Sequence, residues 1–378
     1  MENPFYLQEI PVDAPFCNRQ EEMRELVSFS KAKANVLLYS PRRYGKTSLV
    51  RRVQKSLADQ GAIPLFTDFF GVASIHDVAA CLAKAVFSVT HNQQPLWEKA
   101  LRTIRSFRPV IKPDTEGGIS LSVEAASVGK SGLPLLEETL ESLGDFIRAS
   151  QKLVHVALDE FQEIVTLKEA LRIEALMRSH IQKHRASYFF IGSRRRVLLG
   201  IFNERQRPFF QSAINYPLKK LPEAELVEFI VDQFTKSKRK CSRESAREII
   251  TAVDFHPYYT QKLAFFVFEI SKMVSRESVR DGLEKLLWSE KPVFEAIIQG
   301  LSSQQRLLLY ALGKEPTLKM LSSDYLRKNN LGSIGGVQHS AKKLEEMDLI
   351  EKKEDSGFWC LVDPVFSLWL KRQSEEKV

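Results

Sequence analysis

The stretch "NVLLYSPRRYGKTSLVRRV" at residues 35–53 joins an apolar run to a polar turn and then to a segment with helical periodicity. Its centre reads Gly45-Lys46-Thr47, and Gly-Lys-Thr between a strand and a helix is typical of a phosphate-binding loop. In such loops backbone N–H groups and the helix N-terminus surround the phosphates, lysine contacts the β- and γ-phosphates, and threonine ligates magnesium. The stretch therefore predicts a site for ATP and Mg²⁺, with Lys46 on phosphate and Thr47 on the metal. The nucleotide-binding residues predicted here are Ser40, Pro41, Arg42, Arg43, Tyr44, Gly45, Lys46, Thr47 and Ser48.

Ser40 stands where this motif has its first glycine. A side chain at that position is expected to adopt a backbone conformation that glycine reaches more cheaply. We therefore expect Ser40 to reduce nucleotide affinity or turnover. The alternative interpretation is a chance Gly-Lys-Thr in an ordinary turn.

Two carboxylates end a second apolar run, "KLVHVALDEFQEI" at residues 152–164. At the carboxyl end of a parallel strand, Asp159 can hold magnesium through water, and Glu160 can polarise an attacking water. The structural alternative is a helix N-cap with a neighbouring acid. Asp159 and Glu160 follow the phosphate-binding loop by some hundred residues in the sequence. This order favours the catalytic interpretation.

The segment "SYFFIGSRRRVLLGIF" at residues 187–202 predicts a strand that ends at Gly192-Ser193-Arg194. From the rim of the sheet, Arg194 could sense the γ-phosphate and stabilise transferred charge. A surface cluster of arginines is the alternative. Arg205 or Arg207 could also act in trans if the protein assembles into a nucleotide-dependent homo-oligomer.

Length and composition indicate a multidomain globular protein. The chain has 378 residues, of which 44% are hydrophobic and 27% charged, with a net charge of +8 that favours phosphates or nucleic acid as partners. No run is long and apolar enough for a membrane span, and the start "MENPFYLQEI" does not have the pattern of a signal peptide. We expect a cytoplasmic protein. Four widely spaced cysteines indicate neither a disulfide framework nor a zinc ribbon.

Apolar runs at 36–39, 63–67, 153–158, 187–191 and 215–218 alternate with helical periodicity. This order predicts an α/β fold in which helices cover both faces of a parallel sheet. Residues 109–132 read as a hairpin insertion. We assign residues 1–220 to a P-loop ATPase domain, 221–297 to a helical lid, and 298–378 to a winged helix-turn-helix domain.

The third domain is predicted from its own pattern of caps and periodicity. Ser302 and Gln305 form a potential capping box before "RLLLYAL", and a helix near 321–328 follows. The next helix, 333–347, is expected to place one stripe against the core, and a hairpin with Ser-Gly at its turn closes the domain. The members of that stripe are Ile334, Val337, Ala341, Leu344 and Met347.

Elsewhere, His180 and His184 at i, i+4 spacing are expected to be exposed helix residues rather than zinc ligands, since the glutamate of the zinc-protease motif is missing.

Together these residues resemble the archaeal and bacterial ATPases of the STAND group, within the AAA+-like P-loop class, over nearly the whole chain. "FCNRQEEM" at 16–23 resembles the family's opening motif with Asn18 in place of glycine, and Pro41 to Leu49 match its loop. "FHPYYTQKLA" at 255–264 is similar to its lid motif with Phe255 in place of glycine, and "LVDPVFSLWL" at 361–370 to its ending. The resemblance implies that Asp159 binds magnesium, that Glu160 is catalytic, and that His256 and Pro257 border the nucleotide.

The hypothesis is a slow ATPase that acts as a molecular switch, in which the bound nucleotide sets the arrangement of core, lid and winged helix. Its predicted partners are ATP or ADP together with weakly bound DNA or a protein. One alternative is a DNA-binding initiator or regulator tuned by ATP, and another is a nucleotide-bound scaffold with negligible turnover. Residues 302–378 contain 12 Lys and Arg against 11 Asp and Glu, which argues against a strong DNA reader.

Overall fold

The computed structural model describes residues 3–113, 119–126, 131–353 and 356–375, and these residues form two compact units. The α/β unit comprises residues 11–14 and 19–219. The helical unit comprises the described residues of 3–10, 15–18 and 220–375. No helix in the described part of the chain is long and apolar enough to cross a membrane.

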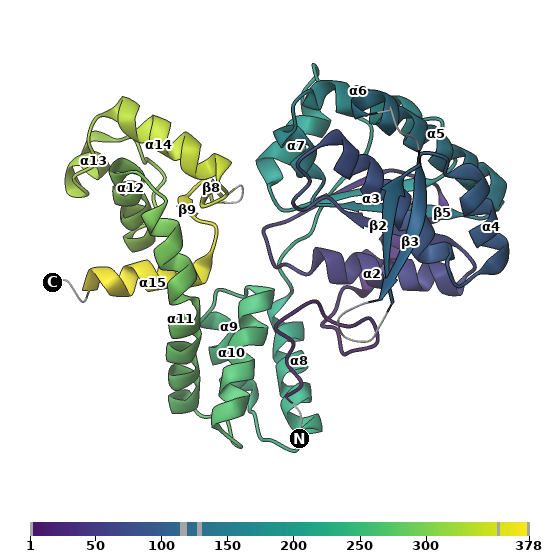
Figure 1. The fold of residues 1–378 in the computed structure, drawn as a ribbon. Coiled ribbons are helices and arrows are strands. Elements are labelled where there is room, and N and C mark those ends of the chain that lie inside the picture. Colours follow the sequence, from purple (N-terminus) through teal and green to yellow (C-terminus); the bar gives the residue numbers. More distant parts are fainter. Residues whose placement is uncertain (1–2, 114–118, 127–130, 354–355, 376–378) are drawn as a thin grey trace. The chain divides into compact units, whose positions relative to one another are not determined.

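A five-stranded parallel sheet forms the centre of the α/β unit, as the apolar runs predict (Figure 1). The strands are β1 (Val36–Tyr39), β2 (Ile63–Asp68), β5 (Val154–Asp159), β6 (Ser187–Gly192) and β7 (Ile214–Pro217), in the order β2-β5-β6-β1-β7. Every residue of β1, β5 and β6 is buried, which explains why these strands read as continuous apolar runs. Their carboxyl ends meet at one edge, where the predicted loop and carboxylates lie.

Helices flank this sheet because each parallel strand must be connected to the next by a crossover. The helices of the unit are α1 (Gln20–Lys31), α2 (Lys46–Asp59), α3 (Ile75–Thr90), α4 (Gln94–Thr103), α5 (Gly132–Ser150), η1 (Phe161–Thr166), α6 (Ala170–Ile181) and α7 (Arg195–Asn203). The predicted hairpin insertion is confirmed as a separate antiparallel pair, β3 (Phe107–Pro113) and β4 (Ile119–Ala125).

The helical unit is built around one continuous hydrophobic cluster. Its elements are α8 (Glu223–Lys236), α9 (Arg243–Thr251), α10 (Pro257–Ile270), α11 (Arg276–Gln299), α12 (Ser303–Lys314), α13 (Ser323–Lys328), α14 (Ile334–Glu346), β8 (Ile350–Lys352), β9 (Trp359–Leu361) and α15 (Pro364–Glu375). Helix α11 joins the two halves, since Phe294 stacks on Phe366 with ring centroids 4.7 Å apart. The Tyr259 hydroxyl also donates to Asp363 Oδ2 at 2.5 Å. The helices predicted as a lid therefore share a core with the winged helix.

The winged-helix order of helices and hairpin is confirmed, but the predicted apolar stripe of α14 is partly wrong. The Ser302–Gln305 capping box is present. Val337, Ala341 and Leu344 are buried, whereas Ile334 and Met347 are 52% and 51% exposed. Ile334 is the first residue of the helix and Met347 its C-cap, so both lie beyond the part of the helix that packs on the core.

The expectation for the two histidines is also wrong. His180 is only 8% exposed, because α6 packs against α5 at this point. His184 is partly buried, and its Nδ1 lies 2.6 Å from the Tyr188 hydroxyl. Helical spacing alone did not distinguish a solvated face from one covered by a neighbouring helix.

Candidate nucleotide-binding site

The loop between β1 and α2 has the strand–loop–helix geometry that the motif predicts. Strand β1 ends at Tyr39 and α2 begins at Lys46, so the N-terminus of the helix lies at the carboxyl edge of the sheet. Gly45 is the N-cap of α2 with φ +83°, and Arg43 has φ +63°. A Cβ at Gly45 would meet nothing within 4 Å, so glycine is favoured here for its backbone angle and not for space.

Ser40 does not strain the loop, and the expectation that it would is wrong. Its φ is not among the positive values of the chain, so the backbone at this position does not require glycine. The side chain is 3% exposed, and Ser40 Oγ lies 3.3 Å from Lys46 Nζ. The serine therefore adds a hydrogen-bond acceptor beside Lys46 and does not strain the backbone.

Lys46 is 6% exposed and lies folded against the loop. Its ammonium donates to the carbonyl of Ser40 at 3.0 Å and to that of Pro41 at 2.9 Å. These carbonyl acceptors hold the buried ammonium in place. The ammonium is thus a preorganised positive charge at the N-terminus of α2, where an anion is already favoured.

Thr47 and Asp159 meet across the loop and β5. Thr47 Oγ1 donates to Asp159 Oδ2 at 2.7 Å, and the Glu160 amide donates to Asp159 Oδ1 at 2.9 Å. Burial raises the pKa of Asp159, the nearby Glu160 and Asp68 carboxylates raise it further, and the two hydrogen bonds oppose this. A bound divalent cation would offset the same repulsion. The donor set, a hydroxyl and clustered carboxylates, fits Mg²⁺.

Asp68 is a site residue that the sequence analysis missed. It ends β2 and is the register partner of Asp159 on the neighbouring parallel strand. Its side chain accepts from the Phe70 amide at 2.8 Å. The signal available in the sequence was an acid at the end of an apolar run, "IPLFTD", which places it at the same edge as the loop.

Glu160 lies at the turn after β5, where three side chains approach one another. Its φ of +46° turns the chain sharply at the end of the strand. Gln162 Nε2 and Ser193 Oγ both donate to Glu160 Oε2, the latter at 3.3 Å. A Cβ on Gly192 would lie 1.9 Å from Gln162 Oε1, so a larger residue there would displace the Gln162 side chain, which donates to Glu160. Gly192, the last residue of β6, and Ser193, which follows it, thus belong to the surroundings of Glu160.

The arginines proposed for catalysis have partners within the α/β unit. Arg194, the N-cap of α7, pairs with Glu163 at 3.3 Å and is 31% exposed. Arg207 pairs with Glu174, which is fully buried. Burial raises the pKa of Glu174 to about 7, although Arg207 opposes the shift. Arg205 is exposed.

His256 and Pro257 lie in the helical unit, at the start of α10. His256 is 5% exposed and is the N-cap, its ring accepting from the Tyr259 amide. That they border the nucleotide stays a prediction. Phe255, where the resemblance has glycine, has φ +57°, a conformation that costs a residue with a Cβ about 1 kcal/mol or more. Asn18, at φ +52°, tolerates the same region better.

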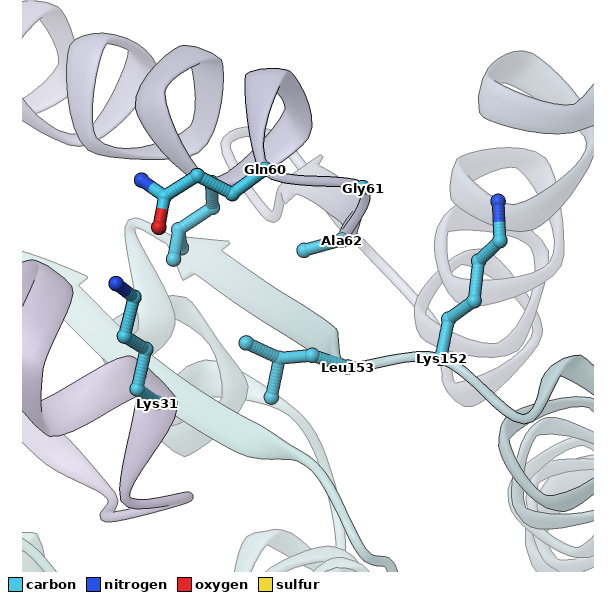
Figure 2. A pocket seen from close by; sticks show the side chains of 7 residues that line it. Lys31, Gln60, Gly61, Ala62, Lys152 and Leu153 are labelled. Atoms are coloured by element: carbon cyan, nitrogen blue, oxygen red, sulfur yellow. The ribbon is translucent and has the colours of Figure 1, made fainter.

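A separate pocket lies at the opposite edge of the sheet. Figure 2 shows Lys31, Gln60 and Lys152 around it, and the segments that line it precede β2 and β5. It therefore lies at the amino ends of these strands, away from the carboxyl edge that bears Asp159. It is not part of the candidate nucleotide site.

Comparisons with known proteins agree with this architecture. Residues 292–372 match a family model described as "Probable winged helix domain". The Walker-type ATPase PABY2304 of Pyrococcus abyssi superposes with a TM-score of 0.72 at 17% identity, covering 97% of this chain and 99% of that one. No curated protein matches the sequence.

Two ORC proteins of Aeropyrum pernix have related structures. ORC2, in its ADPNP-ADP complexes, has a TM-score of 0.58 at 15% identity and covers 98% of both chains. ORC1, in complex with DNA, has a TM-score of 0.53 at 15% identity and covers 99% of this chain and 98% of that one. The chain therefore shares the fold of archaeal Walker-type ATPase and ORC structures, a parallel five-stranded P-loop sheet flanked by helices and followed by a C-terminal winged helix.

Proposed function

We propose that the protein binds and hydrolyses ATP and acts as a molecular switch of the STAND type. The observation that carries this proposal is the junction of Lys46, Thr47 and Asp159, where a loop, a helix N-terminus and a buried strand end meet. A chance Gly-Lys-Thr would not be expected to place its threonine hydroxyl 2.7 Å from a buried carboxylate on another strand.

In this proposal the amides of the loop and of the first turn of α2 bind the phosphates, and Lys46 moves from the loop carbonyls to the β- and γ-phosphates. Thr47 and Asp159 would hold Mg²⁺, which would supply charge compensation on the phosphate oxygens. Glu160 accepts a proton from the attacking water, while Ser193 and Gln162 keep its carboxylate oriented. Arg194 would reach transferred charge only by leaving Glu163.

The second unit is proposed to carry the output of the switch. Because α8–α11 and the winged helix share one core, we expect them to respond as one body and not as a separate lid and module. The partly buried Tyr259–Asp363 hydrogen bond connects α10, whose N-cap is His256, to the start of α15. If His256 borders the nucleotide, this hydrogen bond would transmit a change at the nucleotide directly to the winged helix.

The proposal is tested by measuring ATP binding and phosphate release with the full-length protein. With Mg²⁺, saturable binding and slow release of phosphate are expected. Chelation of Mg²⁺ by EDTA should weaken binding and stop release, since Asp159, Asp68 and Glu160 would then face the phosphates uncompensated. Tight binding without release would support the scaffold alternative, and failure to bind ATP at all would refute the site.

DNA binding is the second candidate function, because the ORC1 structure of related fold contains DNA. On α14 the side chains of Gln338, His339 and Lys342 are exposed. Lys343, however, pairs with Glu346 at 3.0 Å, so part of the basic surface is neutralised within the helix. Lys352 is exposed on the wing, and Glu354 lies outside the described residues.

We expect the full-length protein to bind duplex DNA only in the micromolar, non-specific range at physiological salt, with affinity falling as salt rises. Changing Lys342 and Lys343 together to Glu should lower it severalfold further. The matched control changes Lys236 and Lys238 of the α8 end to Glu, which alters net charge equally. Nanomolar, sequence-dependent binding that only the α14 variant loses would favour the DNA reader instead.

A further inference from the structure

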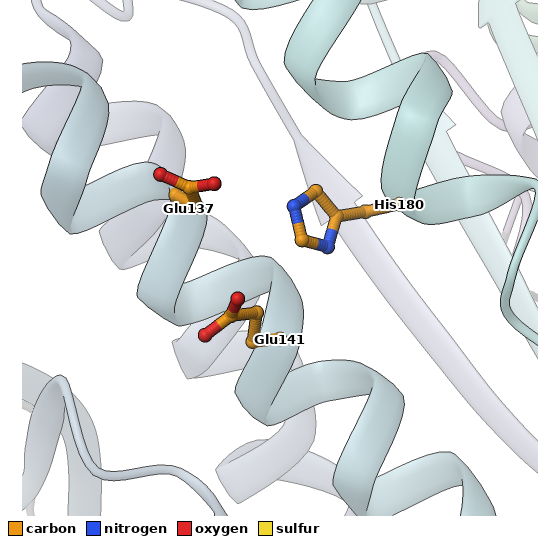
Figure 3. Close-up of side chains that lie close together, drawn as sticks. All are labelled: Glu137, Glu141 and His180. Carbon is orange, nitrogen blue, oxygen red and sulfur yellow. The ribbon is translucent and has the colours of Figure 1, made fainter.

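A cluster outside the nucleotide site combines two carboxylates and an imidazole. Glu137 and Glu141 are one turn apart on α5, and His180 lies near the end of α6. One ligand atom from each residue lies within 4.8 Å of the others. Figure 3 shows the two carboxylates on the face of α5 toward which the His180 ring points.

The imidazole is the feature that distinguishes this cluster from an ordinary acidic surface. His180 is only 8% exposed, and no hydrogen bond of its ring to another described residue is present. The His180 side chain is largely covered, but its ring nitrogens are not among the fully buried unpaired atoms of the described residues, so they remain open to a ligand on the side that faces the two carboxylates. A cation between the three groups would satisfy all of them.

We propose that Glu137, Glu141 and His180 form a binding site for a divalent transition metal ion of the Zn²⁺ type. One nitrogen and two carboxylate oxygens suit Zn²⁺ better than Mg²⁺ or Ca²⁺, which prefer oxygen ligands alone. Metal–ligand bonds of about 2.0–2.2 Å place tetrahedral ligands roughly 3.3 Å apart, a separation that the exposed glutamates can reach by rotamer changes. A fourth position stays open to water or another ligand.

The charges around the cluster agree with this assignment. Burial, and after it the nearby Lys183 ammonium, lowers the pKa of His180, whereas the Glu141 and Glu137 carboxylates oppose this shift. Two carboxylates then balance the two charges of the metal. The ion would clamp α5 to α6, the helix that follows Asp159 and Glu160 after η1. The site is independent of the proposed ATPase activity.

The chain's thiols are poor competitors for the metal. Burial raises the pKa of Cys241 to about 12 and that of Cys360 to about 11, and it also raises the pKa of Cys81. Because metals bind the thiolate, these side chains would bind weakly at pH 7. No two of the four cysteines are close in sequence.

The experiment is calorimetric titration of Zn²⁺ into the full-length, tag-free protein at pH 7, with excess Mg²⁺ and without nucleotide. One equivalent is expected to bind and to raise the melting temperature of the α/β unit. Changing Glu137 and Glu141 together to Gln should weaken binding at least tenfold, and these exposed positions leave folding intact. His180→Gln should do the same.

Two further variants make the result specific. Glu141→His retains a metal ligand and should retain one-equivalent binding. Changing the exposed Glu98 and Glu277 together to Gln removes the same charge elsewhere and should change nothing. Absence of saturable Zn²⁺ binding, or equal affinity in the double glutamine variant at positions 137 and 141, would overturn the proposal.

Discussion

Lys46→Ala is expected to weaken ATP binding by about a hundredfold, which in practice removes it at micromolar nucleotide. The loop amides and the α2 dipole would remain, but the charge that faces the β- and γ-phosphates would be gone. Losing charge-assisted hydrogen bonds worth about 3 kcal/mol corresponds to this factor. Without the ammonium, the carbonyl oxygens of Ser40 and Pro41 would face the phosphates directly. Calorimetry with ATP and Mg²⁺ measures the effect.

The control for this prediction must separate lost binding from lost folding, since Lys46 is buried. Lys55→Ala removes an exposed lysine from the same helix, where it pairs with Asp59 one turn away in a solvated position. Its ATP affinity should match that of the unchanged protein. The melting temperature without nucleotide should be similar in both variants. If a folded Lys46→Ala protein bound ATP normally, the loop would not be the nucleotide site.

Most of the fold could be predicted from the sequence because its signals are local. Strands buried on both faces leave unbroken apolar runs, and Gly45 and the Ser302–Gln305 box mark where helices begin. The union of α8–α11 with the winged helix could not be predicted in this way. It depends on pairs such as Phe294 with Phe366 and Tyr259 with Asp363, which are far apart in the chain and carry no pattern that joins them.

The site shows the same division between local motif and tertiary geometry. The loop and the Asp-Glu pair could be recognised by residue type, but the penalty expected at Ser40 was wrong, because the requirement for positive φ falls on Arg43 and Gly45. A motif records which residue is usual at a position and not which backbone angle this loop adopts. Asp68 was missed because its importance arises from strand register alone.

Glu160→Gln is expected to leave ATP binding nearly unchanged and to lower phosphate release by about two orders of magnitude or more, the scale of losing a general base. Glutamine preserves the size of the side chain and an oxygen that can accept from Ser193 and Gln162, so the turn after β5 should persist. It cannot accept a proton from water at neutral pH. The effect should therefore appear in the maximal rate and not in the ATP affinity.

Glu163→Gln is the matched control for this variant, because it makes the same change three residues further along, on η1. Glu163 pairs with Arg194 and has no contact with Ser193 among those observed for the described residues. If Arg194 serves only to fix η1, the rate in this control should fall little. If Arg194 contributes to the transferred charge, releasing it from Glu163 should leave the rate unchanged or raise it, whereas Arg194→Ala should lower it. A Glu160→Gln protein that kept its turnover would show that Glu160 only shapes the turn, and the catalytic base would then have to be sought among the other acids at this edge of the sheet, with Asp68 first.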